Sequence, residues 1–137
     1  MVIAAAGNEA ADMDIAPHSP ATCNNVITVG ASRRDGGVSS YSSYGSAIDL
    51  LAPGGEPNDG VITTEDSGTQ APLHTEDYGQ RYGTSMATPH VSATAAMMIA
   101  VNPLLSVEDI RTLLADTSTE HVSDCTCLLY TSDAADD

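Results

Sequence analysis

Ser85 stands in the stretch of this sequence that is best suited to chemistry. The stretch Gly83–His90 reads Gly-Thr-Ser-Met-Ala-Thr-Pro-His and places the serine between a glycine turn and an alanine-rich apolar run. That run predicts a buried helix that begins near Ser85, where backbone N–H groups lack intrahelical partners and carry the positive end of the helix dipole. Such a position stabilises negative charge, so the pattern indicates a serine nucleophile.

Asn8 is a candidate for the stabilisation of an oxyanion, which acyl transfer also needs. It follows Gly7 at the end of the apolar run Met1–Ala6. Its amide NH2 and the backbone N–H of Ser85 could together bind the oxygen that becomes negative when a peptide carbonyl is attacked. An asparagine after a glycine is also typical of a simple turn, so the residues alone leave both interpretations open.

Six short segments occur in an order that points to a family. Ala5–Glu9 opens the series and Gly83–Ser85 closes it. Between them lie Ser19–Ala21, Val26–Ala31, Tyr41–Gly45 and Leu51–Gly54. Together these segments resemble the subtilisin-like serine proteases (subtilases). The resemblance implies the C-terminal part of a serine endopeptidase domain, with Ser85 as nucleophile and Asn8 as oxyanion donor. It also implies a three-layer α/β/α fold with a mainly parallel sheet.

The family's catalytic histidine and aspartate precede the oxyanion asparagine. The resemblance therefore implies that this chain lacks both and is inactive by itself. His90 follows Ser85 by five residues on the same predicted helix, where the family has a structural residue. The catalytic histidine of the family stands in a His-Gly motif. None of the three remaining histidines, His18, His74 and His121, is followed by glycine.

Asp66-Ser67-Gly68 imitates the family's aspartate motif, but it lies late in the chain, within a polar stretch. We expect a turn there, because Asp, Ser and Gly favour turns. No acidic cluster has the spacing of an oxygen-ligand loop, so we predict no metal site in this chain. We also predict no cofactor, although the resemblance allows structural calcium in a complete enzyme.

Three residues near Asn8 are candidates for substrate binding. The resemblance places Gly7, Glu9 and His18 near the pocket that receives the residue before the cleaved bond. If Glu9 and His18 line that pocket, it would accept basic or polar side chains; each could instead be a solvated loop residue. Thr84 has two interpretations as well, an additional hydroxyl donor or a helix cap.

Apolar runs predict the elements that position these residues. Strands are expected at Met1–Ala6, Val26–Ala31 and Ile48–Ala52, and their continuous apolar character favours a covered parallel sheet. The stretch from Gly55 to Gln80 is a polar surface excursion in which 61–64 alone is strand-like. The run Met86–Val101 is apolar on nearly every side and predicts a helix surrounded by protein, with Pro89 in its first turn.

A second helix is predicted from a serine N-cap at Ser106 to about Asp116. The last eleven residues, 127–137, resemble a translated sequencing adapter and are expected to be a non-native tail, which leaves 1–126 as the domain portion. Excluding the tail removes Cys127. Cys23 and Cys125 then remain as a pair, or as partners of cysteines elsewhere.

The net charge of −15, with four arginines and no lysine, excludes an electrostatic nucleic-acid binder and disfavours anionic membranes. The resemblance implies an extracellular monomer that acts on polypeptides. A first alternative is a non-catalytic peptide-binding fragment or pseudoprotease. A second is a nucleophile-elbow hydrolase, which Ala87 opposes because it stands where the second glycine of that motif belongs.

Overall fold

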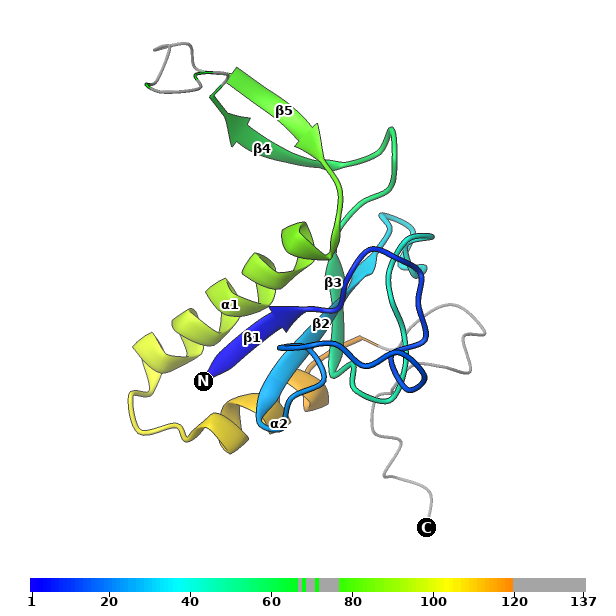
Figure 1. Ribbon diagram of the computed structural model, residues 1–137. Coiled ribbons are helices and arrows are strands. Elements are labelled where there is room, and N and C mark those ends of the chain that lie inside the picture. The colour runs from blue at the N-terminus through cyan, green and yellow to red at the C-terminus, as the bar shows by residue number, and fades with distance from the viewer. Residues whose placement is uncertain (67, 69–70, 72–76, 120–137) are drawn as a thin grey trace.

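The computed structural model describes residues 1–66, 68, 71 and 77–119. Its central sheet has three parallel strands in the order β1 (Val2–Ala5), β2 (Val26–Ser32) and β3 (Leu50–Pro53) (Figure 1). Val2 pairs with Val26, and Val29 pairs with Leu50. The predicted α/β class with a parallel sheet is confirmed, and the predicted strands are present with ends shifted by one or two residues.

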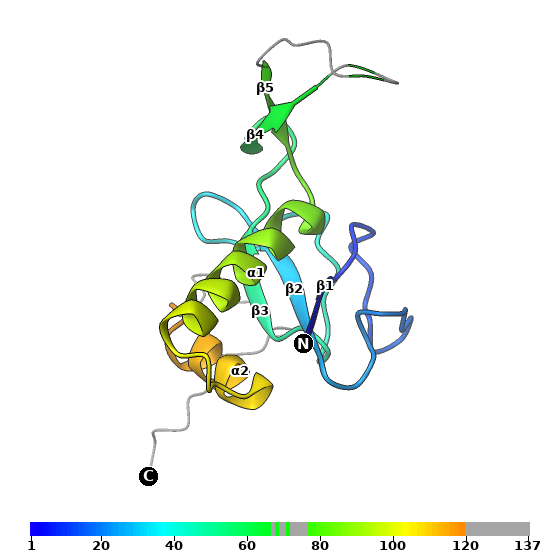
Figure 2. The ribbon, with the colours of Figure 1, turned by 90° about the vertical axis from the view of Figure 1, so that its left-hand side faces the viewer.

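Two helices, α1 (Thr84–Val101) and α2 (Val107–Asp116), cover one face of this sheet (Figure 2). Alternate residues of β2, namely Ile27, Val29 and Ala31, are buried in a core cluster that also contains residues from both helices. From α1 this cluster takes Ala87, Val91 and Ala95. Because alanine is small, the helix can approach the sheet closely, which suits a chain without Phe or Trp.

Loops cover the opposite face of the sheet. A second buried cluster there consists of Ala6, Met13, Ala21 and Ile48. The buried Thr28 hydroxyl donates to the Ala21 carbonyl at 2.6 Å, which satisfies the polar group of a β2 residue facing this layer. This chain therefore contributes the sheet, one helical layer and the loops that follow β1 and β2.

Helix α1 differs from the prediction in two respects. Its buried residues form one stripe, whereas Met97, Ile99 and Val101 are exposed, so the described part of the chain does not surround the helix. Apolar residues on every side gave no periodicity from which to choose the packed face. In addition, Pro89 lies in the second turn, because the helix already begins at Thr84.

Strands β4 (Val61–Glu65) and β5 (Asp77–Arg81) form an antiparallel hairpin that projects beyond the start of α1 (Figures 1 and 2). Sequence indicated the first of these strands and missed the second, because Asp-Tyr-Gly-Gln-Arg has no apolar alternation. Pairing with β4 supplies the strand's hydrogen bonds in place of a buried face.

The serine cap predicted for α2 is confirmed. Ser106 Oγ accepts from the Asp109 N–H at 3.1 Å, and the Asp109 carboxylate accepts from the Ser106 N–H at 2.8 Å, which is a capping box. No helix in the described part of the chain is long and apolar enough to cross a membrane. The predictions for His74, His121, Cys125 and the tail at 127–137 lie outside the described residues.

Candidate active site

Hydrogen bonds between Asn8 and Thr84 join the end of β1 to the start of α1. The Thr84 backbone N–H and hydroxyl both donate to Asn8 Oδ1 at 2.9 Å, and the Gly7 N–H donates to the Thr84 hydroxyl at 3.2 Å. A backbone N–H can only donate, so the Asn8 atom that faces Thr84 is the carbonyl oxygen. The NH2 group of Asn8 is therefore directed away from Thr84.

The N-terminus of α1 is formed by Gly83, whose φ of 145° lies in the region that favours glycine. Its N–H donates to the Gly54 carbonyl at 3.0 Å, which ties the helix start to the segment after β3. Thr84 is thus not the helix cap. Its buried hydroxyl accepts from the Gly7 N–H and donates to Asn8 Oδ1, a bridge that neither interpretation of the sequence, an additional donor or a helix cap, had included.

Two N–H donors border one small space at the start of α1. A Cβ atom built on Gly83 would lie 3.4 Å from Asn8 Nδ2, 3.6 Å from Asn8 Oδ1 and 3.7 Å from the Ser85 backbone nitrogen, so the two nitrogens lie near one point. Among the described residues, none accepts a hydrogen bond from either donor. Ser85 is the second residue of α1 and is exposed. The arrangement can therefore present two unused donors beside an accessible hydroxyl.

The structure brings the three predicted substrate-binding residues together. A Cβ built on Gly7 would lie 2.5 Å from Glu9 Oε2 and 3.2 Å from His18 Nε2. Ser43 Oγ is 3.1 Å from the same point, is buried, and has no hydrogen-bond partner in the described part of the chain. Sequence reasoning missed Ser43 as an individual residue, although its segment Tyr41–Gly45 belongs to the family pattern.

His90 and Asp66 each make a hydrogen-bond contact within their own segment. The His90 ring nitrogen Nδ1 is 2.8 Å from the Met86 carbonyl of the same helix. Asp66 accepts a hydrogen bond from the Gly68 N–H at 2.7 Å, as in a turn. Among residues 1–66, 68, 71 and 77–119, none hydrogen-bonds to Ser85 Oγ, so no base for it is found there.

Tyr41 fixes the segment on which Gly83 rests. Its hydroxyl lies 2.8 Å from the Gly54 carbonyl and 2.9 Å from that of Gly55. Partial burial raises the pKa of this hydroxyl above its ordinary value. Sequence alone gave Tyr41 no individual role.

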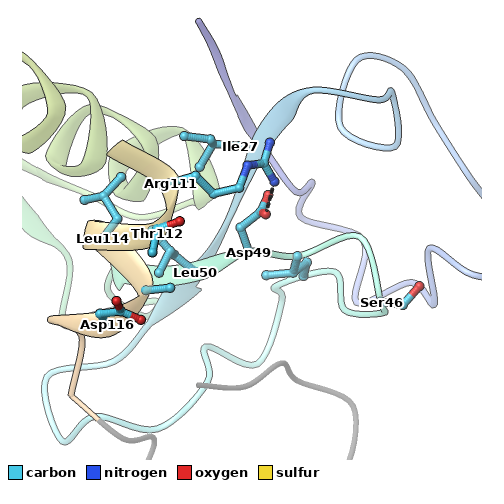
Figure 3. Close-up of a pocket in the computed structure, with 10 residues that line it drawn as sticks. Ile27, Ser46, Asp49, Leu50, Arg111, Thr112, Leu114 and Asp116 are labelled. Carbon is cyan, nitrogen blue, oxygen red and sulfur yellow. Dashed lines mark hydrogen bonds and ion pairs between the residues drawn. The ribbon is translucent and has the colours of Figure 1, made fainter. Parts of the chain in front are cut away.

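A separate pocket of about 350 Å³ lies between α2 and the start of β3 (Figure 3). Arg111 and Asp49 form an ion pair there, and Arg111 also donates to the Val26 carbonyl at 3.0 Å. Asp49 accepts a second bond from the Thr28 N–H at 2.7 Å. Through these contacts Arg111 and Asp49 attach α2 to the sheet. The described residues contain no group of three metal-ligating side chains.

Comparisons with known proteins agree on one family. A model described as the Subtilase family matches residues 1–131. An extracellular protease of Xanthomonas campestris is 39% identical over 118 residues, which are 85% of this chain and 19% of that protein. Subtilisin BL of Lederbergia lenta is 37% identical over 87% of this chain and 39% of its own length.

Solved structures show the same similarity. A protease of Pseudoalteromonas arctica matches with a TM-score of 0.80 at 39% identity, covering 90% of this chain and 37% of that one. A cold-adapted subtilisin-like serine proteinase matches with a TM-score of 0.69 at 35% identity, covering 88% of this chain and 39% of that one. The chain thus spans about one fifth to two fifths of the proteins compared here.

Proposed function

Because this chain belongs to the subtilase family, we propose that it forms part of a serine endopeptidase that hydrolyses peptide bonds through a serine acyl-enzyme. The observation that carries this proposal is the small space at Gly83, bordered by Asn8 Nδ2 at 3.4 Å and by the Ser85 nitrogen at 3.7 Å. An oxyanion is stabilised by hydrogen-bond donors that lie close together, and these two nitrogens lie near one point.

In this mechanism Ser85 Oγ attacks the carbonyl carbon of the scissile bond. The carbonyl oxygen becomes negative and accepts hydrogen bonds from Asn8 Nδ2 and the Ser85 N–H. The positive end of the α1 dipole stabilises the same charge. The proton of Ser85 passes to a histidine and then to the leaving amine, and hydrolysis of the acyl-enzyme releases the second product.

The histidine and its orienting aspartate are proposed to come from a part of the domain outside this chain, as the family resemblance implies. The chain alone is then inactive as a protease, because none of the described residues acts as a base for Ser85. On the same proposal, residues 1–126 are the C-terminal portion of the catalytic domain. No cofactor enters these steps.

Gly7, Glu9 and His18 are proposed to line the pocket for the residue that precedes the cleaved bond. The Glu9 carboxylate and the His18 ring converge on one point beside Gly7, and Gly7 hydrogen-bonds to Thr84 next to the nucleophile. A carboxylate there favours a basic or polar side chain. We further propose an extracellular monomer acting on polypeptides, since a relative is named an extracellular protease.

A chimera tests the proposal, with this chain replacing the matching segment of the Xanthomonas campestris protease. Peptide hydrolysis and labelling by a fluorophosphonate probe are measured. Both should occur in the chimera and vanish in Ser85→Ala, whereas Ser92→Ala, an exposed serine on the same helix, should retain them. A folded chimera that binds peptide but is neither active nor labelled would instead support the pseudoprotease alternative.

A further inference from the structure

The start of α1 is held by hydrogen bonds on two sides. On one side, Asn8 Oδ1 accepts from the Thr84 N–H and hydroxyl, both at 2.9 Å. On the other side, the Gly83 N–H donates to the Gly54 carbonyl at 3.0 Å. Asn8 Nδ2 and the Ser85 nitrogen lie 3.4 and 3.7 Å from a Cβ built on Gly83. The position of Gly83 therefore decides how the Ser85 N–H stands relative to the Asn8 amide.

The segment that receives Gly83, Gly54–Gly55, has little rigidity of its own. Glycine adopts positive and negative φ about equally well, and the φ of Gly55 is 73°. Both N–H groups of the segment donate to the Ser32 carbonyl, at 3.0 and 3.1 Å, which fixes its N–H side. The direction of its two carbonyl groups then depends on the donors that they meet.

Tyr41 supplies such a donor. Its hydroxyl lies 2.8 Å from the Gly54 carbonyl oxygen and 2.9 Å from that of Gly55. Gly55 has a second side-chain donor, because Ser39 Oγ donates to its carbonyl at 2.7 Å. On the Gly54 carbonyl, Tyr41 is the one side-chain donor found among the described residues, and it shares this oxygen with the Gly83 N–H. A carbonyl oxygen can accept both bonds, since it has two lone pairs.

The contact between Tyr41, Gly54 and Gly83 is close-packed. A Cβ built on Gly54 would lie 2.5 Å from Ala31 Cβ, 2.9 Å from the Gly83 carbonyl oxygen and 3.0 Å from the Tyr41 hydroxyl oxygen. Burial raises the pKa of Tyr41 most strongly, while hydrogen bonds with the Ser39 side chain and then the Gly83 backbone act in the opposite direction. The hydroxyl is thus near Gly83 as well as Gly54, and its ring is held against the core cluster.

We propose that Tyr41 is a positioning residue for the reaction at Ser85. Its hydroxyl holds the Gly54 carbonyl, which in turn holds the Gly83 N–H. The start of α1 is thereby kept where the Ser85 N–H lies beside Asn8 Nδ2. This inference rests on the proposed function, which assigns these two nitrogens to the oxyanion.

The effect of the Tyr41 hydroxyl belongs to the reaction step. The two nitrogens bind an oxygen that becomes negative only when the peptide carbonyl is attacked, so a small displacement of the Ser85 N–H weakens the transition state more than the bound substrate. Removal of the hydroxyl leaves the Gly54 carbonyl with its bond from Gly83 and the Gly55 carbonyl with its bond from Ser39. The fold therefore tolerates the change.

The test is Tyr41→Phe in the chimera described above, with Tyr82→Phe as the matched control. Each variant removes one phenolic hydroxyl and keeps its ring, and the two rings contact each other at 5.4 Å. No described residue hydrogen-bonds to the Tyr82 hydroxyl. For a short peptide, Tyr41→Phe should lower kcat by about threefold to tenfold with KM unchanged, whereas Tyr82→Phe should keep the parent kcat.

A pair of inhibitors separates positioning from a general loosening of the site. A peptide aldehyde forms a tetrahedral adduct with the Ser85 hydroxyl, which places an oxygen near the two nitrogens, whereas the corresponding peptide alcohol forms no adduct. Tyr41→Phe should weaken inhibition by the aldehyde by about the same factor as kcat and leave inhibition by the alcohol as in the parent. A loosened site would weaken both inhibitors equally.

An unchanged kcat in Tyr41→Phe, an equal loss in Tyr82→Phe, or equal weakening of both inhibitors would overturn the proposal. If the parent chimera hydrolyses no peptide, the proposed function fails instead. Hydrogen exchange at the Gly83 amide then decides whether Tyr41 holds the start of α1. This exchange should be faster in Tyr41→Phe than in Tyr82→Phe, and equal rates would show that Tyr41 does not hold it.

Discussion

Asn8 Oδ1 accepts two hydrogen bonds from Thr84, one from its backbone N–H and one from its hydroxyl, both at 2.9 Å. The first supplies a partner for an N–H that the start of a helix would otherwise leave unpaired. The second fixes the orientation of the amide. Asn8 therefore acts as a cap for α1 from 76 residues earlier in the chain, and its NH2 group remains available to a ligand.

Thr84→Val tests the positioning role of this hydroxyl in the active chimera. Valine keeps the shape but cannot bond to Asn8, so we expect kcat to fall by roughly tenfold, with little change in KM, because the oxyanion forms only during reaction. Thr84→Ser should recover most of the loss. Steady-state kinetics on a short peptide measures both constants, and an unchanged kcat in the valine variant would remove Thr84 from this role.

Asn8→Ala should have a larger effect, because it removes the donor itself. If Asn8 is the proposed oxyanion donor, we expect kcat to fall by about 10²–10³, the loss seen when the oxyanion asparagine is removed from a subtilisin. Thermal unfolding of the same variant reports the separate loss of the bonds to Thr84. A variant that loses stability but keeps its kcat would show that Asn8 is a structural cap alone.

Gly7→Ala should destabilise the fold. The φ of Gly7 is 102°, and an added Cβ would lie 2.5 Å from Glu9 Oε2, with Ser43 and His18 also within 3.2 Å. We expect a loss of about 1–3 kcal/mol in the free energy of unfolding. Gly36→Ala is the control, because Gly36 also has positive φ, at 86°, but lies in the turn after β2. Denaturant unfolding of both variants should show the larger loss at Gly7.

The strands and helix ends around the site could be predicted from the sequence where the local residue pattern matches the way the element packs. Apolar β-branched runs gave β1 and β2, and a serine three residues before an aspartate gave the cap of α2. The proximity of Asn8 and Ser85 was a different kind of inference. Nothing local connects residues so far apart, so it depended on the ordered family segments.

Other features depend on contacts that leave no local pattern. Strand β5 is polar and exists through its pairing with β4. The face of α1 that packs on the sheet could not be predicted, because apolar residues occur on every side of the helix. The bridge made by Thr84 was not predictable either, because the sequence cannot show whether a hydroxyl at a helix start bonds to its own turn or to a distant strand.

Arg111→Ala should loosen the attachment of α2. Arg111 pairs with Asp49 and bonds to the Val26 carbonyl, and both side chains of the pair are less than one third exposed. Its removal leaves Asp49 with a reduced set of partners, so we expect a loss of about 1–3 kcal/mol in unfolding free energy. Arg34→Ala breaks the far more exposed pair with Asp59 and should cost less than about 1 kcal/mol. Equal losses would contradict the structural role of the Arg111 pair.

The capping box of α2 should make stability depend on acid pH. Hydrogen bonds from the Ser106 hydroxyl and then from its N–H hold the pKa of Asp109 below its usual value near pH 4. Because the folded pKa is lowered, this contribution is fully present above about pH 4 and is lost as the pH falls through the lower, folded pKa.

Asp109→Ala should therefore be less stable than the parent at pH 6, and the difference should shrink as the pH falls towards 2.5. Denaturant unfolding at a series of pH values measures this. Glu108→Ala is the control, since it removes a carboxylate from the same helical turn without touching the capping box, and it separates the hydrogen bonds from the interaction with the helix dipole. A gap between parent and Asp109→Ala that stays constant down to pH 2.5 would show that the stability contributed by Asp109 does not depend on its charge.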